Sequence, residues 1–139
     1  MRATDILTMQ LQGSCDLIVD HAQTASAQWT SRAFDTASLP GFMLWHAARV
    51  LDWGVNAVVR RDAEVAMAGE WRERVRFDLG HGAGLTEEQA DLAARSVSAA
   101  DGGGYARALR RGIDAWLSGV GDADLDTLLA LMKTGAAPA

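Results

Sequence analysis

The sequence contains a single cysteine, Cys15, among its 139 residues. An internal disulfide is therefore impossible, and the reducing cytoplasm is the expected location. Basic residues are also few, because 13 Lys and Arg stand against 18 Asp and Glu and give a formal net charge of −5. A nucleic-acid surface needs a basic face, so we expect no nucleic-acid partner.

Long hydrophobic runs and alternating segments are missing as well. No stretch has the length and purity of a membrane span, so we expect no membrane partner. The first residues, MRATDILTMQLQ, become polar too early for a secretory signal. No segment alternates apolar and polar residues with a period of two, which predicts an all-α protein.

Apolar residues make up 49% of the chain, which is enough for one globular domain. Their spacing predicts three long helices, a short fourth and short accessory helices, as in a four-helix bundle. We expect this single domain to cover residues 1–135, with a shortened last helix that stops at Gly135 and a flexible tail at 136–139. The glycine-rich stretch Ser98–Gly104 predicts a helix stop and restart.

The longest apolar run covers residues 40–56, PGFMLWHAARVLDWGVN. Ser38 and Pro40 lie where a helix N-cap and a first-turn proline belong. Arg60 and Arg61 lie in the last turn, where cations suit the helix dipole. A helix that is apolar nearly all round must be covered by other elements, so we expect it at the centre of the fold.

Two stripes of this central helix predict different surroundings. The first should face the apolar core and consists of Met43, His46, Val50, Trp53 and Ala57. The second is the part that can meet water or line a pocket, and it consists of Trp45, Arg49, Asp52 and Asn56.

The first predicted helix, Ala3 to about Trp29, carries Cys15 and His21 on or near its core side. We expect Cys15 to be a small buried apolar residue, because no basic residue lies within a helical turn to stabilise a thiolate. A lone core histidine is more often hydrogen-bonded in packing than bound to a metal. We therefore expect His21 to be a packing residue, and an additional metal ligand is the less favoured alternative.

The run Leu44-Trp45-His46-Ala47-Ala48-Arg49, with Asp52-Trp53 and Asn56, resembles the WHxAR…D…N helix of the DinB-like superfamily. Gly69–Arg74, GEWRER, resembles the family's GxWxERF segment, and a glycine-rich loop and a T-x-E-Q helix start follow in the family's order. The resemblance implies an up-down-down-up four-helix bundle, commonly dimeric. It also implies a divalent metal (nickel, zinc or manganese) and thiol-dependent transferase, isomerase or hydrolase chemistry with a low-molecular-weight thiol.

His46 matches the metal ligand of the family's second helix. The two histidines of the family's fourth helix have no counterpart, because Gly135 and Ala139 occupy their positions. A catalytic metal site usually needs about three protein ligands, and no H-x-x-x-H pair occurs anywhere in the chain. The resemblance therefore implies a metal site that is incomplete within this sequence.

Three functions stay open at this point. In the first, the protein is a metal-dependent transferase or hydrolase in which His46 is one ligand and Arg49, Asp52 and Asn56 contact a polar substrate. In the second, it is a non-catalytic dimerisation or interaction module, because an incomplete fourth helix leaves apolar surface that favours a homodimer. In the third, tryptophans such as Trp45 and Trp53 line a pocket for a small apolar ligand near His46.

Overall fold

The computed structural model describes residues 1–134, and within that range it is all-α, with no strand. The predicted helix stop at Gly135 and the predicted tail at 136–139 lie outside the described residues. The α-helices are α1 (Ala3–Thr24), α2 (Pro40–Asp52), α3 (Trp71–Arg74), α4 (Glu87–Ser96), α5 (Ala99–Leu117) and α6 (Asp122–Thr134). A π-helix, η2 (Trp53–Val59), continues α2, and the 3-10 turns are η1 (Ser26–Gln28), η3 (Val65–Met67) and η4 (Phe77–Leu79).

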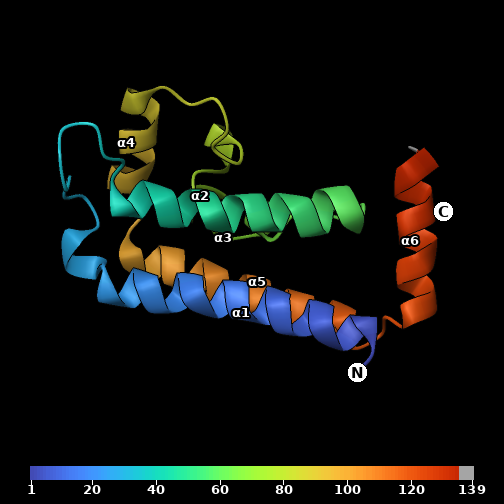
Figure 1. Cartoon of the computed structure of the whole chain (residues 1–139). Coiled ribbons are helices and arrows are strands. Elements are labelled where there is room, and N and C mark those ends of the chain that lie inside the picture. Colours follow the sequence, from blue (N-terminus) through green and yellow to red (C-terminus); the bar gives the residue numbers. More distant parts are fainter. Residues whose placement is uncertain (135–139) are drawn as a thin grey trace.

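Three long helices lie side by side and form the body of the molecule (Figure 1). The chain runs one way along α1 and the opposite way along both α2 and α5. The short helix α4 packs against α2 at one end of this body, and α6 crosses the other end (Figure 1). None of the described helices is both long and apolar enough to cross a bilayer.

The core lies where α1, α2 and α5 meet. Helices α1 and α5 contribute apolar stripes and α2 contributes Trp45 and Ala48, and burial of these side chains supplies most of the helical stability. Cys15 is fully buried there, which confirms its assignment as a core residue. The largest core side chains include Ile18, Trp45, Val75, Tyr105, Leu109, Ile113 and Leu117.

Glycines allow Trp29 to pack between three elements. Its Nε1 donates hydrogen bonds to the carbonyl oxygens of Ala94 (3.1 Å) and Val97 (2.7 Å). A Cβ atom on Gly41 would lie 2.4 Å from that nitrogen, and one on Gly102 would lie 2.9 Å from the indole ring. Both contacts are shorter than packing tolerates, so the α2 and α5 backbones can approach Trp29 only through glycine.

The helix stop and restart predicted around Ser98–Gly104 is present but lies before the glycines, because α4 ends at Ser96 and α5 begins at Ala99. Ser98 caps α5, because its Oγ accepts a hydrogen bond from Asp101 N at 3.0 Å, and the helix continues through the glycines. Packing outweighs the low helix propensity of glycine here. A Cβ atom on Gly104 would lie only 3.0 Å from the Trp71 ring, so this position needs a glycine. The glycines make room for two tryptophans and do not end the helix.

Helix α6 is attached to the start of α1. The Asp122 carboxylate accepts hydrogen bonds from the backbone N–H groups of Thr4 (3.0 Å) and Ala3 (3.3 Å). These are free donors at a helix N-terminus, and the bond from Thr4 is the main cause that lowers the pKa of Asp122. The base of α6 is therefore fixed at the end of the body, while its length extends across that end (Figure 1).

Candidate functional site

The central helix is rotated relative to the sequence prediction. Its polar stripe is buried, with Arg49 1%, Asp52 0% and Asn56 3% exposed. The stripe expected to face the core is instead open to solvent, since Met43 is 59% and Trp53 41% exposed. The expectation that the polar stripe meets water was therefore wrong, and the reason lies in the partners that it finds inside the fold.

Arg49 is the first member of this buried network. Its Nη1 donates to Glu64 Oε1 (2.9 Å) and to the Tyr105 hydroxyl (3.1 Å), and its Nε donates to the Gly80 carbonyl (3.0 Å). The same Nη1 lies 3.5 Å from Asp52 Oδ2. The guanidinium therefore links α2 to α5 and to two connecting segments, and its charge is balanced by two carboxylates.

Asp52 is satisfied on both of its oxygens. The backbone N–H groups of Val65 and Ala66 each donate to it at 2.9 Å, and Asn56 Nδ2 donates at 2.7 Å. The Tyr105 hydroxyl donates the remaining hydrogen bond. Such a carboxylate has no lone pair left for a substrate or a metal, so Asp52 holds η3 onto the central helix.

Tyr105 closes the network from α5. Burial raises the pKa of its hydroxyl, and the negative charge of Asp52 acts in the same direction. The phenol therefore stays protonated and keeps donating to Asp52 while it accepts from Arg49. Neither Tyr105 nor Glu64 was among the residues that the sequence predicted to form a site. An Arg and an Asp three residues apart in an apolar helix, together with a single tyrosine, was the available signal.

His46 lies beside this network, half-buried under the glycine-rich loop. Its Nδ1 is 2.6 Å from the backbone carbonyl oxygen of His81, and the ring stacks on Phe42 at 5.5 Å. A carbonyl only accepts hydrogen bonds, so Nδ1 is the donor here, and Nε2 is the nitrogen left to face a ligand. Gly82 makes this approach possible, because its φ is +94° and a Cβ atom there would lie 2.6 Å from Nδ1.

The other two histidines do not join His46 in a ligand set. His21, expected near the core, is exposed and its Nδ1 lies 2.7 Å from the Leu17 carbonyl, so that expectation was wrong. His81 packs on Trp53, with ring centroids 4.6 Å apart. Within residues 1–134, no three His, Cys, Asp or Glu side chains are grouped so that they could hold a metal ion. These residues therefore do not fit a mononuclear site by themselves.

The two tryptophans predicted to line a pocket have separate surroundings. Trp45 is buried, and its Nε1 donates to the Val75 carbonyl at 2.7 Å, which makes it a packing residue. Trp53 is partly exposed and covers the His81 ring.

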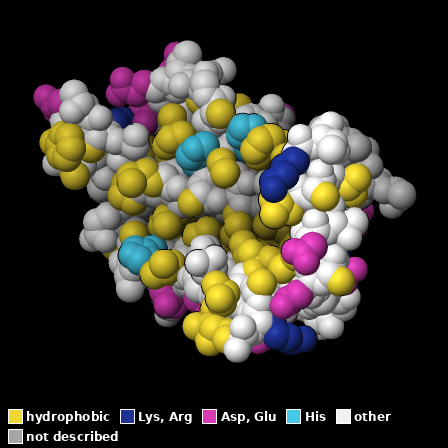
Figure 2. Space-filling view, turned by 45° about the vertical axis from the view of Figure 1, so that its right-hand side comes forward, with side chains coloured by type: hydrophobic (Ala, Val, Ile, Leu, Met, Phe, Trp, Pro, Cys, Tyr) yellow, Lys and Arg dark blue, Asp and Glu magenta, His cyan; other side chains and the backbone are white. Residues whose placement is uncertain are grey.

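An open groove, which we call the apolar groove, lies between α1, η2, α5 and α6. Its volume is about 240 Å³. Figure 2 shows hydrophobic side chains gathered in a hollow on this side of the molecule. Every residue that lines the groove is apolar, and the set is Leu7, Leu11, Val55, Val59, Trp116, Leu125, Leu128 and Leu129.

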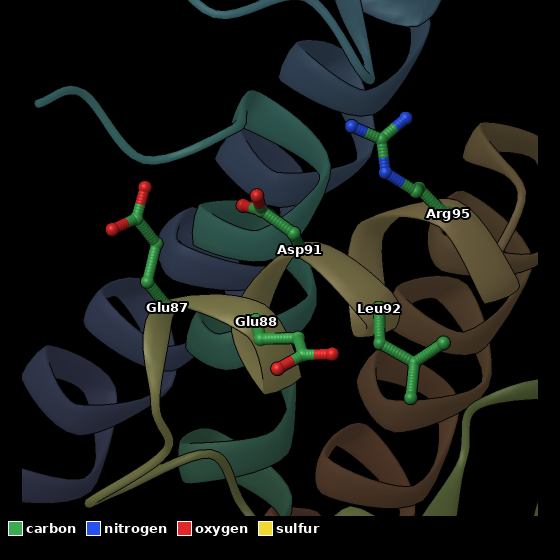
Figure 3. Close-up of a pocket in the computed structure, with 5 residues that line it drawn as sticks. All are labelled: Glu87, Glu88, Asp91, Leu92 and Arg95. Atoms are coloured by element: carbon green, nitrogen blue, oxygen red, sulfur yellow. The ribbon is translucent and has the colours of Figure 1, made fainter. Parts of the chain in front are cut away.

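A second surface hollow, on α4, has no such convergence of groups. Its lining residues are Glu87, Glu88, Asp91, Leu92 and Arg95, which all come from one helix and point in different directions (Figure 3). Asp91 is already paired with Arg32. This hollow therefore lacks the opposing walls of a binding site.

Comparisons with known proteins give no relative. No family model, no curated protein and no solved structure matches the chain. The DinB-like resemblance therefore rests on the motif residues of the central helix and on the order of the segments that follow it.

Proposed function

We propose that this protein is a DinB-like helical module that acts by self-association through its apolar groove. The proposal rests on where the polar and the apolar side chains of the protein lie. The polar stripe that was expected to meet a substrate is buried and makes its hydrogen bonds within the protein. Eight apolar side chains, in contrast, line an open groove. A solvent-facing apolar surface with walls on several helices is typical of an association site.

The DinB-like part of the proposal draws support from topology. The three long helices α1, α2 and α5 run up, down and down, which agrees with the first three helices of the up-down-down-up order (Figure 1). Helix α6 follows next in the chain, but it crosses the end of the body and does not run alongside α1, α2 and α5 as the fourth helix of that order would (Figure 1).

Self-association is tested by molar mass in solution. We expect light scattering after gel filtration to give twice the 14.8 kDa chain mass for the wild-type protein. Leu129→Glu should give the single-chain mass, because Leu129 lines the groove and is 53% exposed. Leu92→Glu on α4 is the matched control, since Leu92 is 43% exposed and lies outside the groove. A wild-type protein that stays monomeric at high concentration would refute the proposal.

The second candidate is a metal-dependent transferase or hydrolase that uses a low-molecular-weight thiol. The free Nε2 of His46 favours it, because a second hydrogen bond that fixes the ring and its tautomer is typical of metal-ligating histidines. His46 would be one ligand of a nickel, zinc or manganese ion, and the remaining ligands would have to come from a second copy.

Metal content tests this second candidate. The purified protein is loaded with nickel, zinc or manganese and then dialysed, beside His46→Ala and the exposed-histidine control His21→Ala. Near-stoichiometric metal in the wild type and in His21→Ala, lost in His46→Ala, would support it. No retained metal in any of the three proteins would leave His46 as a packing residue.

A further inference from the structure

The π-helix η2, which follows the central helix, belongs to both the buried network and the apolar groove. Its widened turn is closed by Arg60 N, which donates to the carbonyl oxygen of Val55 five residues earlier at 2.9 Å. Such turns are rare and frequently occur at functional sites. Val55 and Val59 of η2 line the groove, whereas Asn56 between them is part of the network. A shift of this one element would therefore be felt in both regions.

Arg60, at the end of η2, connects the two regions through its side chain. Its Nη1 donates to Asn56 Oδ1 at 2.8 Å, and Asn56 Nδ2 donates in turn to Asp52 Oδ1 at 2.7 Å. The guanidinium carbon of Arg60 lies 5.6 Å from the centre of the Trp116 ring, which forms part of the groove wall on α5. A continuous line of contacts therefore runs from the groove wall to the centre of the network.

The contacts of Arg60 differ in how well they resist solvent. Its ion pair with Asp62 is 3.6 Å long and involves a carboxylate that is 64% exposed, so water and salt screen it. Asn56 is only 3% exposed, so the hydrogen bond to it is shielded. A guanidinium over an indole adds a cation–π attraction. The orientation of Arg60, and with it the place of the Trp116 ring, is therefore set mainly from the buried side.

We propose that Arg60 and Asn56 are positioning residues for the apolar groove, because together they hold the Trp116 ring against η2 and set the width of the groove. The groove then binds its partner with full affinity only while Asn56 holds Arg60. This consequence for binding rests on the proposed self-association. The placement of Trp116, in contrast, is a property of each single chain and can be measured without any partner.

Fluorine NMR of protein labelled with 5-fluorotryptophan measures the surroundings of Trp116. The chain holds five tryptophans, and the signal that disappears in Trp116→Phe identifies this one. All samples carry Leu129→Glu, so that association does not move the signals. We expect Asn56→Ala to shift or broaden the Trp116 signal, although its direct contact is with Arg60. Adding Asn56→Ala to Arg60→Ala should change the signal little further, because the two residues act through one contact.

Tyr105→Phe is the matched control for a weakened network. Like Asn56→Ala, it removes a hydrogen bond to Asp52, but it leaves Arg60 and Asn56 paired. We expect it to leave the Trp116 signal in place. Equal shifts in Tyr105→Phe and Asn56→Ala would mean that general loosening moves the ring, and an unmoved signal in Asn56→Ala would mean that the ring needs no such support. Either result would overturn the proposal.

The dissociation constant of the protein without Leu129→Glu tests the consequence for binding. Asn56→Ala should raise it about 5-fold or more, the usual size of coupling between distinct sites, although Asn56 does not line the groove. Arg60→Lys should do the same without touching the buried network, because an ammonium cannot pack flat on the indole and also hydrogen-bond to Asn56 as the planar guanidinium does.

The outcomes separate this inference from the proposed function. A dimeric wild type whose dissociation constant is unchanged in both Asn56→Ala and Arg60→Lys would overturn the role of these residues in binding and leave self-association standing. A wild type that stays monomeric would refute self-association and the dependence of binding on Asn56. The fluorine signal of Trp116 would still decide whether Asn56 and Arg60 position the groove wall.

Discussion

The buried polar network and the apolar groove invert the usual distribution of side chains. Arg49, Asp52 and Asn56 are polar and lie inside, where every one of them is hydrogen-bonded. The groove residues are apolar, and their open side faces solvent. The two regions share the central segment, because Asn56 of the network and Val55 of the groove are neighbours in η2.

The comparison shows that the type of a residue predicts neither its burial nor its function in this chain. Polar residues in a helix motif suggest a substrate site, but here each has a complete set of internal partners, so the network holds connecting segments in place. Apolar residues suggest a core, but here part of the set lacks cover, so it provides a surface for a partner. Substitutions in the buried polar network should therefore lower the stability of the fold, whereas substitutions in the apolar groove should mainly weaken association.

The largest effect is expected for Asp52→Ala. The change leaves the Arg49 guanidinium buried beside an empty position and removes the acceptor of Val65 N and Ala66 N. Breaking a buried ion pair from one side costs about 3–5 kcal/mol of unfolding free energy. Urea unfolding measures the loss, and Asp62→Ala is the control, because the Asp62 side chain is 64% exposed. Equal losses in the two variants would contradict a stabilising role for the network.

Tyr105→Phe should have the next largest effect. It removes the hydroxyl that joins Arg49 to Asp52 and keeps the ring in the core. A buried hydrogen-bonding group that loses its partner costs about 1–3 kcal/mol. The loss in the double variant with Asp52→Ala should be smaller than the sum of the two single losses, because the residues act together. Additive losses in urea unfolding would show that the two residues are independent.

For Cys15 we expect an effect of intermediate size, on the pH dependence of the unfolding free energy. Burial raises the pKa of its thiol from 9.0 to about 11, and the charge of Asp16 acts in the same direction. The unfolded thiol loses its proton first, so this contribution to stability is complete below pH 9 and is lost as the pH rises through about 11. Cys15→Ala should therefore show a shallower fall of unfolding free energy over this range. An identical fall in both proteins would place the effect elsewhere.

The smallest effect on folding is expected in the groove. Leu129→Gln exchanges an exposed leucine for a polar residue of similar length, so the unfolding free energy of the monomer should change by no more than about 0.5 kcal/mol. Association should weaken all the same, as gel filtration over a dilution series would show. A large loss of monomer stability would mean that Leu129 belongs to the core and would remove the contrast between the two regions.

Local features of the chain were predictable because they depend on neighbours in sequence. The predicted T-x-E-Q helix start is residues 86–89, and it forms a capping box in which Thr86 N donates to Gln89 Oε1 (2.9 Å) and Gln89 N donates to Thr86 Oγ1 (3.2 Å). The helix predicted from Ala3 forms and ends at Thr24, slightly before the predicted Trp29. The central helix starts at Pro40 as its proline predicts, but its N-cap is Leu39 and not the predicted Ser38. The DinB-like family, the metal and the dimer stay predictions.

The orientation of the central helix was not predictable, because it depends on partners far away in sequence. Tyr105 is 53 residues from Asp52, and no pattern within α2 shows that a phenol and two backbone N–H groups will meet that carboxylate. Burying a polar stripe is favourable only once all of these partners are in place. The rule that apolar stripes face inward therefore failed for a helix with a fully paired polar side.

The sequence by itself determined an all-α chain, the starts of α1, α2 and α4 and the capping of α4, because propensity, capping and apolar spacing act over a few residues. Tertiary structure alone decided which side of the central helix is buried, that the glycines at 102–104 continue α5, and that α6 crosses the end of the body. Each of these outcomes depends on contacts between distant segments, such as Trp29 with Gly102 and Asp122 with Thr4. Such contacts become favourable only when packing has brought both segments together.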